Sequence, residues 1–222
     1  MITKLYKNRF ELFFFSVLAI LFGSLVIPKS FFDTVMMPVF FLVNIASGIL
    51  LMSKKKNLMW FFIVTFGIAL FIFGRSMLYK QLSDSYQFVR FTIYFLFYTT
   101  ITFEIIKQVW KASFVNKNVI FGLMSGYICL GLIGFFIFSS IEMSIPNSFS
   151  GFPMGEENFV DRVSSLLYFS YITLLTIGYG QIIPVTAIGQ KAVILVGLSG
   201  QFYIIILTAV IVEKYIRHSH RD

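Results

Sequence analysis

The chain has 222 residues, of which 58% are hydrophobic and only 13% are charged. This composition excludes an ordinary water-soluble domain and places the chain among membrane proteins. The net charge of +8 gathers in short loops between apolar stretches, which argues against a nucleic-acid-binding surface, and the single cysteine, Cys129, excludes a disulfide within one chain.

Six apolar stretches are long enough to cross a bilayer, since a spanning helix needs roughly 17–25 residues. They cover residues 10–27, 35–52, 58–78, 88–109, 119–141 and 187–213. The basic start of the chain is like that of a signal peptide, but no small-residue cleavage site follows it. We therefore expect the first helix to be retained in an all-α membrane protein with six transmembrane helices.

The segment between the fifth and sixth stretches is too short and too polar to span. Residues 142–161 contain two prolines and two glycines and are expected to form a loop. Residues 162–175 then predict a half-length, re-entrant pore helix. Its carbonyl end would place partial negative charge beside the residues that follow, which favours a cation there.

The distribution of charge predicts the orientation of the helices. With the N-terminus in the cytoplasm, twelve basic and four acidic residues fall inside, against six of each outside. This satisfies the positive-inside rule and predicts a multi-pass protein with both termini cytoplasmic.

The segment after the half-length helix has residue types suited to a dehydrated cation. It reads Thr176-Ile177-Gly178-Tyr179-Gly180. Backbone carbonyls can replace the water lost by an ion, and a threonine hydroxyl can add a further oxygen. Because glycine tolerates positive φ, Gly178 and Gly180 would let successive carbonyls point the same way. Tyr179 is expected to point backwards and brace the loop.

These five residues resemble the selectivity filter of the potassium-channel family. The resemblance continues without a gap through Pro184-Val185-Thr186, Gly189 and Gly200, and covers roughly residues 119–215. It implies that K⁺ passes rings of carbonyls in a homotetramer. It also implies a gating hinge at Gly200, for which close helix packing is the alternative, and a water-filled cavity lined by Gln201, Ile204 and Thr208.

Two positions depart from the family pattern. Gln181 stands where the family usually has aspartate, and Tyr168-Phe169 stand where it usually has tryptophans. Phe169, Thr173 and Gln181 are expected to support the filter, but the tryptophan–aspartate hydrogen bond cannot form. The rigidity of the outer filter is therefore in question, whereas the carbonyl rings are unaffected. Acidic residues before the half-length helix, Glu156, Glu157 and Asp161, either attract cations to the mouth or form a solvated loop.

The first four stretches resemble the sensor region of voltage-gated potassium channels without its charges. The positions three apart from Arg90 are Ile93, Leu96 and Thr99. Since several charges are needed for steep gating, we expect little voltage dependence. Arg90 is then an outer-edge anchor, and Glu104 an interfacial partner of Lys107 or Lys111.

The expected organisation is a four-helix region over residues 1–117 and a pore domain over residues 118–222. The expected function is a potassium-selective channel in a prokaryotic plasma membrane, with K⁺, the bilayer and its own copies as partners, and with no cofactor and no nucleic acid. The alternatives are a weakly selective cation channel and a voltage-gated or regulatory subunit. A transporter subunit and an enzyme are disfavoured, because the chain has one intact filter motif and no nucleophile–base pair or metal cluster.

Overall fold

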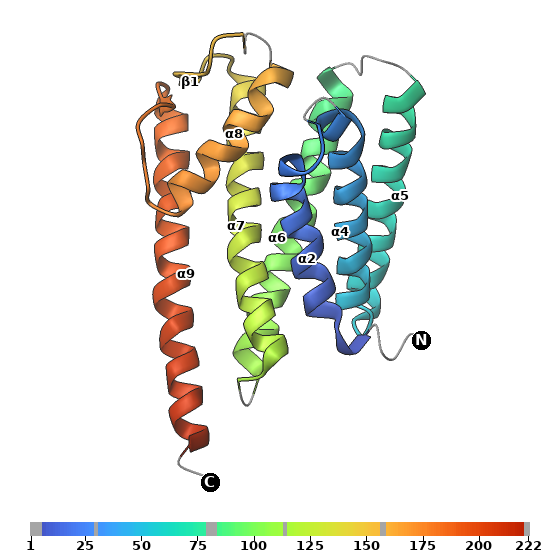
Figure 1. The fold of residues 1–222 in the computed structure, drawn as a ribbon, viewed down its shortest axis with the longest axis vertical. Helices are drawn as coiled ribbons and strands as arrows, with labels where there is room; N and C mark the ends of the chain where they lie inside the picture. Colours follow the sequence, from blue (N-terminus) through green and yellow to red (C-terminus); the bar gives the residue numbers. More distant parts are fainter. Residues whose placement is uncertain (1–5, 29–30, 79–83, 113–114, 156–158, 220–222) are drawn as a thin grey trace. The chain divides into compact units, whose positions relative to one another are not determined.

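The computed structural model describes residues 6–28, 31–78, 84–112, 115–155 and 159–219, and most of these residues are helical (Figure 1). The elements are α2 (Arg9–Phe22), η1 (Gly23–Leu25), η2 (Phe32–Met36), α4 (Met37–Leu51), α5 (Lys56–Leu78), α6 (Asp84–Lys111), α7 (Lys117–Ser144), β1 (Phe149–Ser150), α8 (Phe159–Leu174), β2 (Ile183–Pro184) and α9 (Ala187–Ser219). They form two compact units. Unit 1 holds residues 1–93 and 103–126, and unit 2 holds residues 94–102 and 127–222.

Four helices in the described part of the chain are long and apolar enough to cross a membrane. These are Lys56–Arg75, Phe88–Lys111, Lys117–Ser144 and Ala187–Lys214. Met37–Leu51 is apolar but shorter, although the π-helical turn η2 precedes it directly. A helix thus lies at each of the six apolar stretches, and four of them reach spanning length by themselves.

The first helix ends earlier than the sequence predicts. The apolar stretch 10–27 suggested one helix up to Pro28, but α2 ends at Phe22 and a 3₁₀ turn follows. A Cβ atom built on Gly23 would lie 2.5 Å from the ring of Phe32. Glycine therefore allows the chain to turn against the following segment at this point.

In unit 1, α2 packs along α4, and α4 packs along α5 (Figure 1). The interface between α2 and α4 is mostly aromatic and aliphatic, with one polar bridge. The fully buried Asn44 amide donates to the Ser16 hydroxyl over 2.8 Å and to the Phe13 carbonyl over 3.3 Å. Such interhelical hydrogen bonds fix the register of apolar helices that have no hydrophobic driving force between them in lipid.

In unit 2, the short helix α8 packs against α7 through two glycines. A Cβ atom on Gly131 would lie 2.2 Å from the ring of Tyr171, and one on Gly134 would lie 2.6 Å from the Ser170 hydroxyl. The close approach allows two hydrogen bonds from α8 to carbonyls of α7. Ser170 donates to Gly131 over 2.6 Å, and Tyr171 donates to Ile128 over 2.7 Å.

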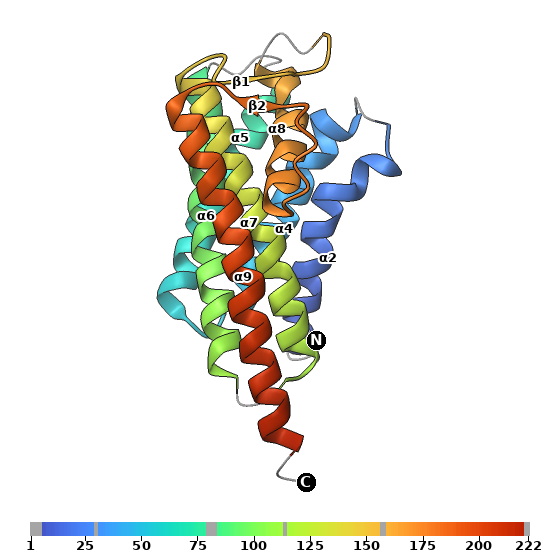
Figure 2. The ribbon, with the colours of Figure 1, turned by 90° about the vertical axis from the view of Figure 1, so that its left-hand side faces the viewer.

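The chain reverses direction at the lower end of α8. It then returns as an extended segment to β2, after which α9 begins (Figure 2). β2 pairs with β1 in antiparallel fashion, with Phe149 opposite Pro184 and Ser150 opposite Ile183. The Val185 amide also donates to the Ser148 carbonyl over 2.9 Å. This pairing joins the loop before α8 to the chain that follows the returning segment.

Candidate functional site

The returning segment has an alternating backbone conformation. Thr176, Gly178 and Gly180 have φ angles of +57°, +57° and +78°, whereas Ile177 and Tyr179 do not have positive φ. In an ordinary extended strand, successive carbonyls point to opposite sides. Positive φ at every second residue rotates alternate peptide groups, so that successive carbonyls can face one side. Positive φ at Thr176 was not expected from the sequence, because it is strained for a β-branched residue.

The lower end of this segment is fixed to the last turn of α8. The Thr176 amide donates to the Thr173 carbonyl over 3.0 Å, and the Ile177 amide donates to the Ile172 carbonyl over 2.9 Å. Thr173, which the sequence suggested as a support of the filter, thus contributes its backbone carbonyl. These bonds determine where the alternating segment begins relative to the carbonyl end of the helix.

Most of the segment is exposed in a single chain. All residues from Leu175 to Gln181 are exposed, and the Tyr179 side chain is 67% exposed. The expected bracing of the loop by Tyr179 therefore finds no counterpart in the burial of this side chain within its own chain. A row of carbonyls from one chain also cannot surround an ion, because a ring needs several copies.

Phe169 anchors α8 by packing. Its ring lies 5.2 Å from the centroid of Phe138 on α7 and 5.7 Å from that of Phe149 on β1, and all three side chains are buried. Phe138 and Phe149 are themselves 5.4 Å apart. This aromatic trio joins three elements that surround the returning segment, and so provides support without the hydrogen-bond donor that a tryptophan would offer.

Gln181, at the upper end of the segment, is in close backbone contact with the preceding loop. A Cβ atom on Gly151 would lie 1.8 Å from the Gln181 carbonyl oxygen, and Gly151 has a φ of +86°. Only glycine fits this position, on grounds of space and of conformation. The loop before α8 therefore lies directly on the end of the filter motif. Glu156 and Glu157 lie outside the described residues.

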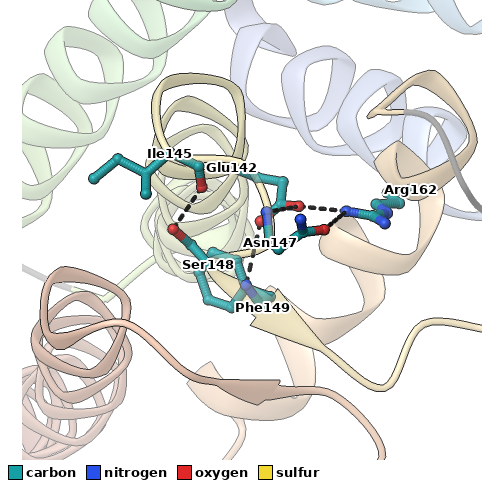
Figure 3. A network of polar contacts seen from close by, with 6 residues as sticks. All are labelled: Glu142, Ile145, Asn147, Ser148, Phe149 and Arg162. Atoms are coloured by element: carbon teal, nitrogen blue, oxygen red, sulfur yellow. Dashed lines mark hydrogen bonds and ion pairs between the residues drawn. The ribbon is translucent and has the colours of Figure 1, made fainter.

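A buried ion pair between Glu142 and Arg162 holds the loop that joins α7 to β1 (Figure 3). The Glu142 side chain at the end of α7 is 2% exposed, and its carboxylate accepts from the Arg162 guanidinium of α8 over 2.6 Å. It also accepts from the backbone amides of Asn147 over 3.1 Å and Phe149 over 3.2 Å. Arg162 donates in addition to the Asn147 side-chain carbonyl over 3.2 Å. Both carboxylate oxygens thus accept a hydrogen bond, and one of them also pairs with a cation, as a buried charge requires.

Sequence reasoning missed this network. By the charge distribution, Glu142 is only one of the six outer acidic residues and Arg162 one of the six outer basic ones. The available signal was an acidic residue at the end of an apolar run, twenty positions before a lone arginine at the start of a short helix. That signal does not specify the partner, because the intervening loop determines which residues meet.

α9 contacts the end of α8 and the returning segment through Gly200 and Gln201. A Cβ atom on Gly200 would lie 2.5 Å from the Leu174 carbonyl at the end of α8, whereas Gly197 has nothing within 4 Å. Gln201 donates to the Thr176 hydroxyl over 3.4 Å. Ile204 and Thr208 are exposed further along α9. Gly200 thus has a packing role in this conformation, and its role as a hinge remains a prediction.

Unit 1 contains one correction to the expected ion pairs. Glu104 is buried and pairs with Lys55 from the connection between α4 and α5, and not with Lys107 or Lys111 of its own helix. Pairs one turn apart on a helix are easily predicted from sequence, whereas this pair joins residues 49 positions apart. The Arg90 guanidinium lies over the ring of its neighbour Phe91, 5.4 Å from the ring centroid. No group of three or more metal-ligating side chains occurs among the described residues.

Comparison with known proteins identifies the part of the chain that holds this site. Residues 122–217 match the family model described as an ion channel. This match supports a channel function. The ion channel domain covers α8, the alternating segment and α9 up to residue 217, and begins within α7. No curated protein and no solved structure shows a significant match to the chain.

Proposed function

We propose that the protein is a potassium-selective channel that conducts K⁺ passively as a homotetramer. The observation that supports this most directly is the positive φ of Thr176, Gly178 and Gly180 within the ion channel domain. A backbone of this kind can present successive carbonyls to a dehydrated cation. Thr176, Ile177, Gly178 and Tyr179 supply the carbonyl rings, the Thr176 hydroxyl supplies the innermost one, and Gly180 completes the turn.

Four copies are proposed because each chain has one filter motif and an exposed filter segment. The aromatic trio, the β1–β2 pair and the Glu142–Arg162 ion pair hold this segment from the side of its own chain. The carbonyls of residues 176–179 then face the central axis of the tetramer, and the cavity below them is lined by Gln201, Ile204 and Thr208. In the proposed topology, six helices span a prokaryotic plasma membrane, α8 is re-entrant and both termini are cytoplasmic.

A planar-bilayer recording of the purified protein tests the proposal. With potassium on one side and sodium on the other, the current should reverse near the equilibrium potential of potassium. A reversal near zero would instead identify a weakly selective cation channel, the alternative favoured by Gln181 and Phe169 at their altered positions. No current from protein with intact fold would favour a regulatory subunit.

A pair of glycine variants tests the filter assignment. Gly178→Ala should abolish the current, because an alanine at φ +57° is strained and its relaxation turns a filter carbonyl away from the ion. Gly155→Ala is the matched control. Gly155 has a φ of +92° and open space around it, but lies in the outer loop. Equal currents from the two variants would contradict the assignment of Gly178 to the filter.

A further inference from the structure

A basic pocket lies at one end of unit 1, and all of its lining residues lie outside the region that matches the ion channel family. Its volume is about 330 Å³. The lining comes from the start of α2, the α4–α5 connection, the end of α6 and the start of α7. The lining residues are Arg9, Phe10, Lys55, Lys107, Gln108, Val109, Lys111, Ala112, Asn116, Asn118 and Val119.

The charge of the pocket is only partly balanced by the protein. Four lining residues are basic, namely Arg9, Lys55, Lys107 and Lys111, and Lys55 pairs with Glu104. Lys107 and Lys111 are exposed and make no ion pair within the described part of the chain. The pocket therefore keeps an excess of positive charge, which favours an anionic ligand.

Arg9 adds an unused hydrogen-bond donor. Its guanidinium lies over the rings of Tyr6 and Phe10, at 4.2 and 4.8 Å from their centroids, and its Nη1 donates to the Tyr6 carbonyl over 3.1 Å. These contacts hold the side chain in place. The Arg9 Nε atom is nevertheless buried without a partner, which is costly unless a ligand supplies an acceptor.

The start of α7 contributes polar groups that also favour an anion. Asn116 caps this 28-residue helix by accepting from the Val119 amide over 3.1 Å, and Asn118 lies in the pocket lining. The N-terminus of a helix has partial positive charge and favours phosphate oxygens. An arginine held by two aromatic rings, two exposed lysines and a helix N-terminus together suit a phosphate group better than a carboxylate.

The position of the pocket along the helices indicates the source of the phosphate. Three apolar spans have one end beside the pocket. These ends are Lys56, Lys111 and Lys117. The ends of apolar spans lie where lipid headgroups lie, and basic pockets between such ends bind anionic headgroups. We propose that this pocket binds the phosphate of an anionic phospholipid through Arg9, Lys107 and Lys111.

Calorimetric titration of the full-length protein in an uncharged detergent tests the site without any measurement of conduction. The probes are dioctanoyl-phosphatidylglycerol and dioctanoyl-phosphatidylcholine, each used below its critical micellar concentration, and inorganic phosphate. Phosphatidylglycerol should bind more tightly than phosphatidylcholine, which has the same phosphate but no net charge. Tight binding of inorganic phosphate that depends on the same lysines would retain the site and assign it to the free ion.

Two double variants separate the pocket from general surface charge. Lys107→Gln/Lys111→Gln should weaken phosphatidylglycerol binding about 25-fold, because each lysine should contribute roughly fivefold. Lys7→Gln/Lys56→Gln removes the same charge from exposed residues outside the lining and should leave binding within about twofold. Equal weakening by the two variants, no weakening by either, or equal binding of the two lipids would overturn the proposal. Arg9→Gln is a second test, with an expected loss above tenfold.

Discussion

Among the ion pairs of the described residues, Glu142 has the most buried carboxylate, with 2% of its side chain exposed. Its carboxylate accepts from two backbone amides of the following loop and from the Arg162 guanidinium of α8. A single carboxylate therefore holds together the end of α7, the loop that leads to β1 and the first turn of α8. The position of the loop that contacts Gln181 thus depends on one side chain that lies outside residues 176–180.

Glu142→Gln should destabilise the protein by roughly 3 kcal/mol, because it leaves the Arg162 guanidinium without its buried counter-charge. Thermal unfolding in detergent measures this loss. Where the variant remains folded, its current should decline faster during a sustained voltage step. Glu11→Gln is the matched control, since Glu11 pairs with Lys117, whose side chain is 68% exposed. Such an exposed pair contributes less than about 1 kcal/mol. Equal destabilisation by both changes would contradict the special role of Glu142.

At the scale of the element, α8 depends on glycines of α7 for its position. Gly131→Ala should destabilise the protein by about 1–3 kcal/mol, because its Cβ would overlap the Tyr171 ring. Gly67→Ala serves as the control, as Gly67 lies within α5 with nothing within 4 Å. The control should be neutral or slightly stabilising, since alanine favours the helix over glycine. Thermal unfolding of both variants measures the two changes in stability. An unchanged unfolding temperature for Gly131→Ala would show that the contact between α7 and α8 is loose.

Two glycines of α9 allow the hinge and packing roles to be separated. Gly200→Ala should destabilise the folded protein, because its Cβ would press on the Leu174 carbonyl, whereas Gly197→Ala should not. A hinge role of Gly200 would instead change gating without changing stability. Open probability in a bilayer would then fall on substitution by alanine while the unfolding temperature stayed the same.

α6 is the element that would have to move for voltage sensing. Its turns after Arg90 present no further basic residue until Lys107. We expect Arg90→Gln to leave the dependence of open probability on voltage unchanged, as measured by voltage steps in a bilayer. A large shift of the midpoint would show that α6 senses voltage through this residue.

The limits of sequence reasoning differ between elements. The helices α5, α6, α7 and α9 could be predicted because continuous apolar runs of spanning length have one common structure. α8 was expected at residues 162–175 and occupies Phe159–Leu174. The strand pair β1–β2 could not be foreseen, because strands of two residues leave no periodic pattern. The motif indicated the glycines of positive φ, but the Thr176 conformation and the Glu142–Arg162 pair depend on tertiary contacts.

At the scale of the whole molecule, the exposed apolar surface of the ion channel domain is the notable feature. Side chains along α9 are about half exposed or more in a single chain, among them Ile194, Leu195, Phe202 and Ile205. Lipid covers part of such a surface, and neighbouring copies cover the rest in the proposed assembly. Light scattering of the purified protein, corrected for detergent, should give the mass of four 25.6 kDa chains. A monomer or dimer that still conducts potassium would contradict the tetramer.

The pairing of β1 with β2 has a consequence for how the protein is made. It joins the two ends of residues 151–182 within one chain, so that α8 and the returning segment are closed into a loop by contacts that need no second copy. The Gly151 contact with Gln181 and the aromatic trio close this loop further. Much of the conformational entropy of the returning segment is thus lost when the single chain folds and not when copies associate. In the proposed tetramer, assembly would then join segments that each subunit has already ordered, and this lowers the entropy cost of association in the bilayer.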